Sequence, residues 1–326
     1  MPKVLILGAT GYLGSQIADL LVKSGQHTVF GVARTPAKAT QLGRQEIIPI
    51  LCPDPVNEPE PYLSAISSKH IDVVIDVAGA DQGSHNFLRD IARLGQERLT
   101  ADKSRGVKGS KLGFIYCSGT WVHGSSNEPV NDLDLVGTDA KTQPEDQVVW
   151  RVEMEKAVLQ AADALDVMIL RPALIYGREG TIWSSFFLPV FEVAKSKTAS
   201  SVDIPLDGQS RPGLIHVDDA AKGFVSAVEK LHLISRTGVY PVFDLVTTQE
   251  SMREIFQALA MCWGFKGTVV FKGHGGNVFA KAMSASLRGS SARAQQVLAW
   301  QPTRLGGFVQ DMDIYASAFV AQHIRY

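Results

Sequence analysis

Three glycines spaced three residues apart follow an apolar run near the start of the chain. Residues 4–7 are all apolar, which is typical of a strand buried on both faces of a parallel sheet. From Tyr12 onward, apolar residues recur at helical spacing until Gly25, a residue type that commonly ends a helix. The sequence therefore predicts a strand, a glycine-rich turn and a helix. The glycines of the turn are Gly8, Gly11 and Gly14.

The position of these glycines between a strand and a helix gives each of them a physical purpose. Gly8 permits a tight turn, Gly11 lets the backbone approach a ligand closely, and Gly14 lets the helix pack against the strand. The helix N-terminus adds unpaired N–H groups and a partial positive charge, which together favour a phosphate. We therefore predict that this turn binds the pyrophosphate of a dinucleotide. The other turn residues expected to contact it are Thr10, Tyr12 and Leu13.

Strand and helix patterns alternate through the first half of the chain. Further strands are predicted at residues 27–33, 46–51, 71–77, 112–117 and 167–170, and helices at residues 84–99 and 147–162. This alternation predicts an α/β fold, namely a doubly wound parallel sheet of the Rossmann type with right-handed crossovers. We assign residues 1–175 to this dinucleotide-binding domain.

The regular alternation ends after Gly177. Residues 183–193 are predicted as an apolar helix and residues 196–212 as a polar loop, and Asp218 or Asp219 is expected to cap a helix. Downstream, residues 239–246 and 268–272 are predicted strands, and residues 249–263 a helix. Residues 176–326 are therefore predicted as a mixed region, a smaller substrate lobe interleaved with a return of residues 214–247 to the main sheet.

Composition and charge restrict the partners and the location. The 326 residues carry 32 basic and 33 acidic side chains, a net charge of -1, which argues against nucleic acid and against a polybasic membrane anchor. No apolar run reaches the ~18–20 residues needed to span a bilayer, and the N-terminus does not have the pattern of a signal peptide. The three scattered cysteines fit a reducing compartment and form no metal-ligand spacing. We expect a cytoplasmic protein with a small-molecule substrate and no metal.

Several segments carry a resemblance to a known family. The G-x-x-G-x-x-G spacing is the form found in short-chain dehydrogenases/reductases, and the chain resembles their extended branch, the nucleotide-sugar epimerase/dehydratase-like proteins. Residues 171–177 (RPALIYG) look like the family's R-P-x-x-x-Y-G segment, and residues 216–221 (HVDDAA) like its H-V-x-D-x-A segment. Residues 292–302 resemble a late A-R-x-x-L-G-W-x-P element, with Ala299 in place of glycine. Members of the family often dimerise, so the resemblance implies a possible homodimer.

The end of the second predicted strand indicates which dinucleotide binds. An acidic residue there would accept a hydrogen bond from the ribose 2′-hydroxyl, but no acidic residue occurs between positions 25 and 46. Instead Arg34 offers a planar donor fork suited to a phosphate, with Thr35 and Lys38 beside it. We therefore predict NADP(H) rather than NAD(H). Further cofactor contacts are expected at Asp54, Ala78, Gly79, Pro172 and Ala173, and at Arg151.

The Tyr-x-x-x-Lys pair that the resemblance leads us to expect is missing. In the family, lysine and the cofactor lower the pKa of the tyrosine, so that the phenol exchanges a proton at neutral pH. None of the seven tyrosines here has lysine four residues later. Alignment places Gln147 at the tyrosine position and Arg151 at the lysine position. Glutamine cannot ionise, whereas arginine keeps the charge and would still hold the nicotinamide ribose without acting as a base.

The substrate-orienting serine or threonine of the family is displaced as well. Gly119 stands at its position, flanked by Ser118 and Thr120, so either hydroxyl would polarise a carbonyl. His123 or Tyr176 would be a substitute proton donor. The catalytic candidates are therefore Ser118, Thr120, Arg151, His123 and Tyr176.

Three functions remain open from the sequence. The first choice is an NADP(H)-dependent oxidoreductase that acts on a small carbonyl or hydroxyl compound. The second is an NADP(H)-binding redox sensor or regulator without turnover, resembling the NmrA-like proteins. The third is a non-redox isomerase or cyclase that uses the cofactor as a structural element. For the substrate pocket, Trp121, Trp150 and Trp183 are candidate apolar wall residues, whereas Arg211 alone is too little to indicate a diphosphate substrate.

Overall fold

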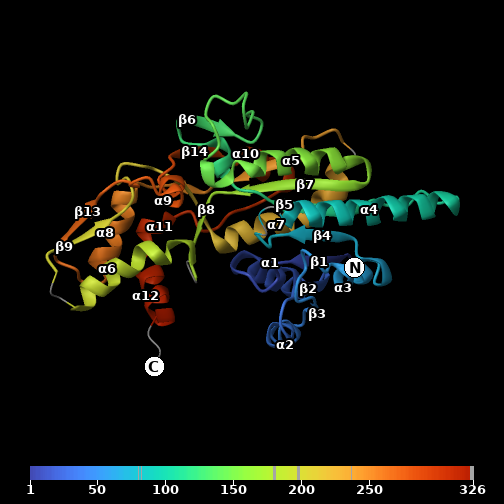
Figure 1. The fold of residues 1–326 in the computed structure, drawn as a ribbon, viewed down its shortest axis with the longest axis horizontal. Helices are drawn as coiled ribbons and strands as arrows, with labels where there is room; N and C mark the ends of the chain where they lie inside the picture. The colour runs from blue at the N-terminus through green and yellow to red at the C-terminus, as the bar shows by residue number, and fades with distance from the viewer. Residues whose placement is uncertain (80, 82, 179–180, 197–198, 236, 324–326) are drawn as a thin grey trace.

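The centre of the structure is a seven-stranded, fully parallel sheet, seen in a computed structural model that describes residues 1–79, 81, 83–178, 181–196, 199–235 and 237–323 (Figure 1). The strand order is β11-β7-β5-β4-β1-β2-β3, so the order reverses beside β1. This is a doubly wound sheet, and the predicted fold class is confirmed. The strands are β1 (Lys3–Leu7), β2 (Thr28–Ala33), β3 (Ile48–Leu51), β4 (Val73–Asp76), β5 (Leu112–Cys117), β7 (Leu165–Pro172) and β11 (Val242–Leu245).

Helices cover both faces of this sheet. On one face lie α1 (Tyr12–Lys23), α2 (Pro36–Arg44), α7 (Val217–Ile234) and α10 (Ala292–Leu298). On the other face lie α3 (Glu60–Ser68), α4 (Gly83–Ser104) and α5 (Trp150–Gln160). Because successive strand residues point to opposite faces, β1 sends Val4 and Ile6 to the first layer and Leu5 and Leu7 to the second. The residues of this strand are therefore all apolar from Val4 to Leu7 because both faces of the strand are buried.

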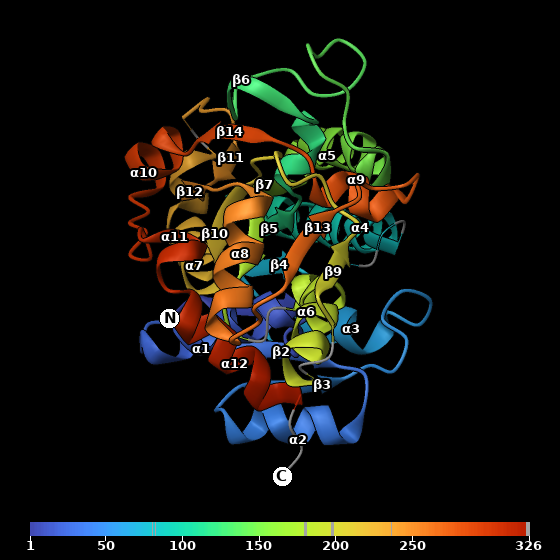
Figure 2. The same cartoon turned by 90° about the vertical axis from the view of Figure 1, so that its left-hand side faces the viewer.

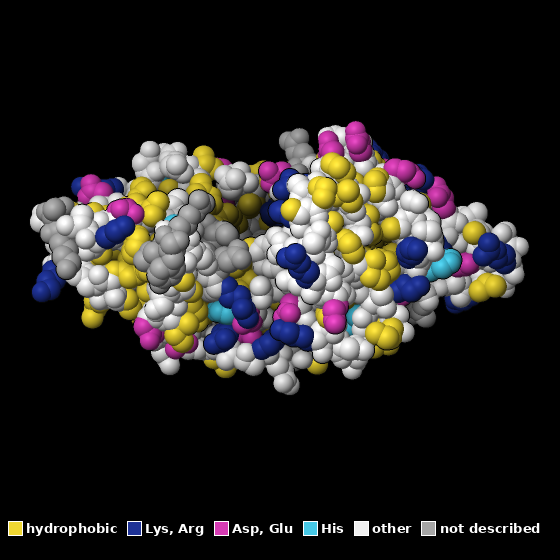
Figure 3. Space-filling view, turned by 90° about the horizontal axis from the view of Figure 1, so that it is seen from below, with side chains coloured by type: hydrophobic (Ala, Val, Ile, Leu, Met, Phe, Trp, Pro, Cys, Tyr) yellow, Lys and Arg dark blue, Asp and Glu magenta, His cyan; other side chains and the backbone are white. Residues whose placement is uncertain are grey.

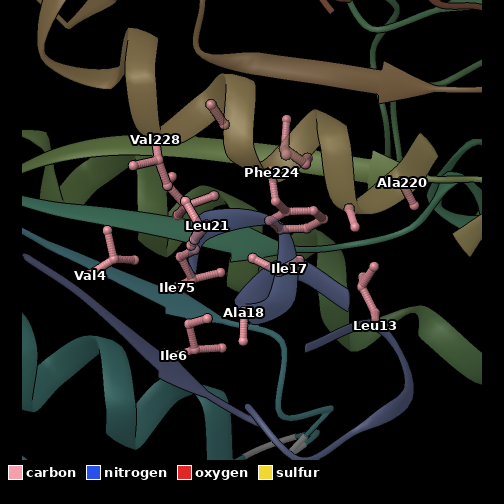
Figure 4. Packing of buried hydrophobic residues seen from close by; sticks show 14 of the residues in the cluster. Val4, Ile6, Leu13, Ile17, Ala18, Leu21, Ile75, Ala220, Phe224 and Val228 are labelled. Carbon is pink, nitrogen blue, oxygen red and sulfur yellow. The ribbon is translucent and has the colours of Figure 1, made fainter. Parts of the chain in front are cut away.

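The packing of α1 holds the glycine-rich turn in place. Figure 4 shows Ile17 and Leu21 of α1 between the sheet residues Ile6 and Ile75 and the aromatic ring of Phe224 on α7. Ile17, Leu21 and Phe224 are fully buried. The helix that follows the glycines is thus fixed from two sides, by the sheet and by α7.

A smaller lobe built mainly from the second half of the chain lies beside the carboxyl ends of the strands (Figures 1 and 2). Its core is aromatic, with Trp183, Phe187 and Phe308 in mutual ring contact. Its helices are α6 (Ser184–Ser196), α8 (Met252–Cys262), α9 (Val278–Met283), α11 (Gly307–Gln310) and α12 (Met312–His323). In the described part of the chain, no helix is long and apolar enough to cross a membrane.

Short strands connect the lobe with the main sheet. β8 (Leu174–Tyr176), β10 (Gly213–His216) and β12 (Thr248–Gln249) form one small sheet, β9 (Ser201–Ile204) pairs with β13 (Thr268–Phe271), and β6 (Ser126–Asn131) pairs with β14 (Leu287–Ser290). Between β10 and β12 the chain returns to the main sheet. In this segment α7 covers one face of the main sheet, and β11 forms one of its edge strands. A domain boundary at residue 175 stays a prediction.

Three local features differ from the sequence predictions. Helices α2 and α3 were not predicted, although Thr35 and Pro36 are typical of a helix start, and the Thr35 hydroxyl accepts a hydrogen bond from the Lys38 N–H. Segment 196–212 contains β9 rather than only a loop, because β13 from a distant part of the chain pairs with it. Asp218 and Asp219 do not cap α7, since the ring nitrogen of His216 accepts the Asp218 N–H.

This histidine cap makes the stability of the protein depend on pH. Burial lowers the pKa of His216 below its ordinary value of ~6.5, although Asp218 opposes the shift. Only the neutral ring can accept the Asp218 N–H, so its contribution is present above pH ~6.5 and is lost as the pH falls below that value. A His216→Asn variant keeps a cap that does not titrate. Between pH 8 and pH 5, the wild type is expected to lose ~1 kcal/mol more unfolding free energy than the variant, measured by urea denaturation. Equal losses in both proteins would contradict this role of the histidine.

Candidate functional site

A cavity of about 430 Å³ lies at the carboxyl ends of the central strands, next to the point where the strand order reverses. In open α/β sheets this crevice is the usual place for a ligand. Its walls come from the glycine turn at residues 11–13, from residues 77–79, 117–121 and 172–175, and from α5. Figure 3 shows the molecule hollowed between its two halves, with hydrophobic side chains inside the hollow.

The glycine turn forms one end of the cavity and cannot hold larger residues. A Cβ on Gly8, whose φ is +92°, would lie 2.8 Å from the Ala78 backbone. A Cβ on Gly14 would lie 2.1 Å from the Gly8 carbonyl oxygen. Gly11 is the N-cap of α1 and lines the cavity, and no side chain caps the first N–H groups of the helix. The close packing of this turn explains the need for glycine at positions 8 and 14, and phosphate binding by the turn stays a prediction.

The other residues of the turn divide into two groups. Tyr12 and Leu13 line the cavity, and the Tyr12 hydroxyl donates a hydrogen bond to the Gly177 carbonyl, which ties the turn to the segment after β8. Thr10 is half-buried and is not among the residues that line the cavity. Ala78 and Gly79, both exposed, form the neighbouring wall as expected.

The residues predicted to select the dinucleotide lie outside the cavity, along the ends of β2 and β3. Arg34 is exposed, and within the described residues it has no ion-pair partner. Thr35 caps α2 through the Lys38 N–H, so its hydroxyl already has a structural role. Asp54 accepts hydrogen bonds from Asn57, which hold the pKa of its carboxyl below the ordinary value. The end of β2 thus carries an exposed cation, Arg34, and the selection of a dinucleotide by this residue stays a prediction.

Two hydroxyls line the cavity at the end of β5. Ser118 is 5% exposed, and its hydroxyl has no hydrogen-bond partner although it is fully buried. Thr120 begins a 3-10 turn (Thr120–His123) and is also buried. Buried hydroxyls are normally satisfied, so the unpaired hydroxyl of Ser118, a residue of the cavity wall, is a candidate contact for a ligand.

Gly119, between these hydroxyls, has room for a side chain. Its φ of -173° is ordinary extended backbone, and the nearest heavy atom to an added Cβ would be the Pro172 carbonyl oxygen at 3.7 Å. The serine or threonine of the family would therefore fit here without strain. Its absence is a chemical difference rather than a steric necessity.

Arg151 on α5 provides the positive charge of the cavity. Its guanidinium donates to the Cys117 carbonyl at 2.8 Å and to the Tyr116 hydroxyl at 3.3 Å, and it stacks over the Trp150 ring at 4.8 Å. The residue one turn earlier, Gln147, lies in a 3-10 turn before α5, is exposed and does not line the cavity. The arginine thus stands where a ligand would lie, whereas the glutamine does not.

Asp76 and Cys117 are two groups that the sequence analysis missed. Asp76 ends β4 and is buried; one carboxyl oxygen accepts the Ala78 N–H at 3.1 Å and the other has no partner. Burial raises the pKa of this carboxyl above its ordinary value. Burial also raises the pKa of the Cys117 thiol to about 12, so this cavity-lining cysteine stays protonated at neutral pH. The sequence pattern that could have identified Asp76 is a carboxylate inside the otherwise apolar run of residues 73–77, because an unpaired acidic residue is rarely buried.

The structure does not bring His123 and Tyr176 to the cavity. His123 is 3% exposed, and its Nε2 lies 2.8 Å from the Asp244 carboxylate. Tyr176 is fully buried in the lobe, where its ring stacks on Phe308 at 4.6 Å and contacts Tyr315, and burial raises the pKa of its phenol. Both side chains are packed into structural contacts, which leaves Ser118, Thr120 and Arg151 as the catalytic candidates at the cavity.

Some of the remaining candidate residues line the cavity and others do not. Trp121 lines the cavity, whereas the Trp183 indole donates to the Ile175 carbonyl inside the lobe core. Arg211 lies 3.5 Å from Glu254 on the surface, outside the cavity. Pro172 and Ala173 form part of the cavity wall, and their contact with a cofactor stays a prediction. The described residues contain no cluster of three or more potential metal ligands.

The unpaired hydroxyl of Ser118 leads to a direct test. Ser118→Ala removes no hydrogen bond of the free protein, so its unfolding free energy is expected to stay within ~0.5 kcal/mol of the wild type. Ligand affinity or turnover is expected to fall by roughly 10-fold. Ser210→Ala is the matched control: its buried hydroxyl donates to the Asp207 carbonyl outside the cavity, so ~1 kcal/mol of stability is lost and activity is kept. Loss of stability without loss of ligand binding in Ser118→Ala would contradict the assignment.

A doubly wound parallel sheet with a glycine turn and a cavity at the point of strand reversal defines a Rossmann-fold protein. The model of the NAD dependent epimerase/dehydratase family matches residues 4–242. The chain therefore belongs to this family, and the resemblance inferred from its sequence is confirmed. No curated protein matches the chain.

Solved structures of similar fold cover nearly the whole chain. A dTDP-glucose 4,6-dehydratase from Bacillus anthracis in complex with NAD is 13% identical, with a TM-score of 0.71 over 98% of this chain and 97% of that one. A UDP-glucuronic acid 4-epimerase from Bacillus cereus is 19% identical, with a TM-score of 0.65 over 99% and 100%. A UDP-glucose 4-epimerase from Bifidobacterium longum, in complex with NAD+ and UDP, is 18% identical, with a TM-score of 0.65 over 98% of both chains. At these identities the likeness shows the fold.

Proposed function

We propose that the protein is an NADP(H)-dependent oxidoreductase that acts on a small carbonyl or hydroxyl compound. The observation that carries this proposal is the cavity itself, whose walls combine the glycine turn with Ser118, Thr120 and Arg151. A bound nicotinamide dinucleotide supplies hydride donation or acceptance at its nicotinamide ring. Membership of the family and the NAD present in the solved neighbours support a dinucleotide of this kind.

The residues present fit the dinucleotide along its length. Gly11, which lines the cavity, and the uncapped N–H groups at the start of α1 suit the pyrophosphate. Ala78 and Gly79 offer an exposed backbone wall for the adenosine side. At the nicotinamide end, Arg151 would hold ribose hydroxyls. The buried hydroxyl of Ser118 has no hydrogen-bond partner in the protein, which supports a polar ligand group beside it.

The roles of the cavity side chains follow from their chemistry. Ser118 and Thr120 would donate hydrogen bonds to a substrate carbonyl oxygen, which stabilises the negative charge that develops there. Arg151 adds a fixed positive charge but does not exchange protons, because its pKa is too high. Without the tyrosine, proton transfer would pass through a hydroxyl or a water molecule. The loss of a general acid costs roughly 10²–10⁴-fold in rate. We therefore expect slow turnover.

The preference for NADP(H) rests on Arg34 and is tested by its removal. Although the solved neighbours contain NAD, no acidic side chain occupies the β2 end of this chain. Arg34→Ala is expected to weaken NADPH binding by about 10- to 100-fold and to leave NADH binding within about twofold, because a charge-assisted contact to the 2′-phosphate is lost. Calorimetric titration measures both affinities. Arg44→Ala, an exposed arginine at the other end of α2, is the matched control. An unchanged NADPH-to-NADH ratio in Arg34→Ala would exclude this role.

The redox activity is tested with a panel of carbonyl compounds. Cofactor-loaded protein is expected to oxidise NADPH in the presence of at least one aldehyde or ketone, followed by the nicotinamide absorbance. The exposed position of Gln147 outside the cavity favours the alternative, a cofactor-binding regulator without turnover. Tight NADPH binding with no oxidation across the panel would support that alternative and overturn the oxidoreductase.

A further inference from the structure

We propose that the substrate is an uncharged compound with an apolar body, an alkyl or aryl carbonyl compound or the corresponding alcohol, and not a nucleotide sugar. This inference rests on the proposed function, because it assigns a substrate class to the same cavity. It starts from five large apolar side chains that line the cavity and do not belong to the glycine turn. Those side chains are Trp121, Val148, Leu174, Ile175 and Ile182.

These five side chains come from different parts of the fold and share one chemistry. Val148 precedes α5, Trp121 lies in the turn after β5, and the three aliphatic residues come from β8 and the segment that leads into α6. The ring of Trp121 makes an edge contact with Phe279 of α9 at 6.3 Å, and Phe279 stacks on Phe186 of α6. The apolar wall is therefore continuous with the aromatic packing of the lobe, which makes it a rigid surface.

The polar groups of this cavity are too few for a nucleotide diphosphate. Ser118 and Thr120 suit one carbonyl or hydroxyl oxygen, and the single guanidinium, that of Arg151, is held by the Cys117 carbonyl. A nucleotide diphosphate brings at least two negative charges, which are costly to bury without cations. Apolar walls with one small set of convergent polar groups instead suit a small, largely apolar ligand.

Two cations of the lobe have acidic partners outside the cavity. Arg211 lies 3.5 Å from Glu254, and Lys281 lies 2.7 Å from Asp146. In the described part of the lobe, no lysine or arginine lines the cavity. A substrate with phosphate groups would therefore meet aliphatic side chains on the lobe side, whereas an alkyl or aryl group would bury apolar surface against them.

The test compares a series of methyl ketones of four to eight carbons with UDP-glucose. Each ligand is titrated by calorimetry into the protein with and without NADP+, so the readout does not require turnover. Ketone affinity is expected to rise about threefold to fourfold per added methylene until the cavity is filled, as burial of a CH₂ group predicts. UDP-glucose is expected not to bind. A flat ketone series, no ketone binding, or measurable binding of UDP-glucose at the cavity would overturn the inference.

Matched valine variants place the ketones in the cavity. Val148→Thr exchanges a methyl group for a hydroxyl in the wall and is expected to weaken binding of the longest ketone about 5- to 10-fold, because a polar group is left unpaired beside it. Val149→Thr changes the adjacent residue, which is 52% exposed, and is expected to have no effect. Ile182→Thr repeats the test from the lobe side. Equal effects of Val148→Thr and Val149→Thr would place the ketones elsewhere and overturn the inference.

The two proposals fail in distinguishable ways. If ketones bind with the expected slope but NADPH is never oxidised, the oxidoreductase function fails and the apolar substrate class remains. If NADPH is oxidised only with charged or phosphorylated carbonyl compounds, the function remains and the apolar class is wrong.

Discussion

Gly14→Ala is expected to destabilise the protein by more than ~3 kcal/mol and to abolish dinucleotide binding. The added Cβ would lie 2.1 Å from the Gly8 carbonyl oxygen and 3.2 Å from a methyl group of Val77. A backbone oxygen cannot move away as a flexible side chain would, so α1 must shift from β1. Because α1 is held between the sheet and α7, that shift also disturbs the buried packing around Ile17. Urea denaturation and calorimetric titration with NADPH measure the two losses.

Gly43→Ala is the matched control for this prediction. Gly43 lies in the exposed part of α2, and an added Cβ there would meet no heavy atom within 4 Å. Alanine is the better helix former, so this variant is expected to gain about 0.5–1 kcal/mol and to bind NADPH as the wild type does. If Gly14→Ala were as stable as the wild type and bound NADPH, the close approach of α1 to the turn would not require glycine at this position.

Asp244→Ala is expected to cost about 3–5 kcal/mol of stability, because it removes a buried carboxylate that lies beside both Arg171 and His123. Arg171 is 1% exposed; its guanidinium binds both oxygens of Glu155 and lies 3.7 Å from Asp244. The same Asp244 carboxylate contacts His123. Pro172, next to Arg171, belongs to the cavity wall, so the variant is also expected to weaken ligand binding.

A surface pair serves as the control for this network. Arg93 and Glu97 on α4 lie 2.8 Å apart, but both side chains are more than half exposed. Glu97→Ala is therefore expected to change stability by less than ~1 kcal/mol. Chemical denaturation of both variants measures the contrast. A loss in Asp244→Ala as small as that in Glu97→Ala would mean that the buried network does not hold this part of the fold.

The network explains the segment RPALIYG, one of the segments that carry the resemblance to the family. Arg171 makes a buried ion pair with α5, and Pro172 lines the cavity. Tyr176 lies in the lobe core, and a Cβ on Gly177 would lie 2.2 Å from the His216 ring. One short segment therefore joins the sheet, the cavity and the lobe. Its residues have structural purposes, which is why Tyr176 was a misleading candidate for a proton donor.

The positions aligned with the catalytic pair of the family lie differently in the structure than the motif predicts. Counting residues placed Gln147 and Arg151 one helical turn apart on a single predicted helix, residues 147–162. In the structure α5 begins only at Trp150, and Gln147 lies in a 3-10 turn with its side chain exposed. Arg151 faces the cavity as expected. Helical periodicity could not reveal this change at the helix start, because the contacts that decide it come from other parts of the chain.

Local patterns in the sequence were sufficient for the architecture. The apolar run of residues 4–7, the glycine turn and the alternation of strands and helices determine the parallel sheet and the location of its ligand crevice, because each depends on neighbouring residues and on the requirement to bury two faces. Which polar groups face that crevice was decided by tertiary structure alone. His123 is removed from it by Asp244, 121 residues away in the chain, whereas Ser118 is left there without a partner. Hydrogen bonds between residues so distant in the chain leave no periodic pattern in the sequence.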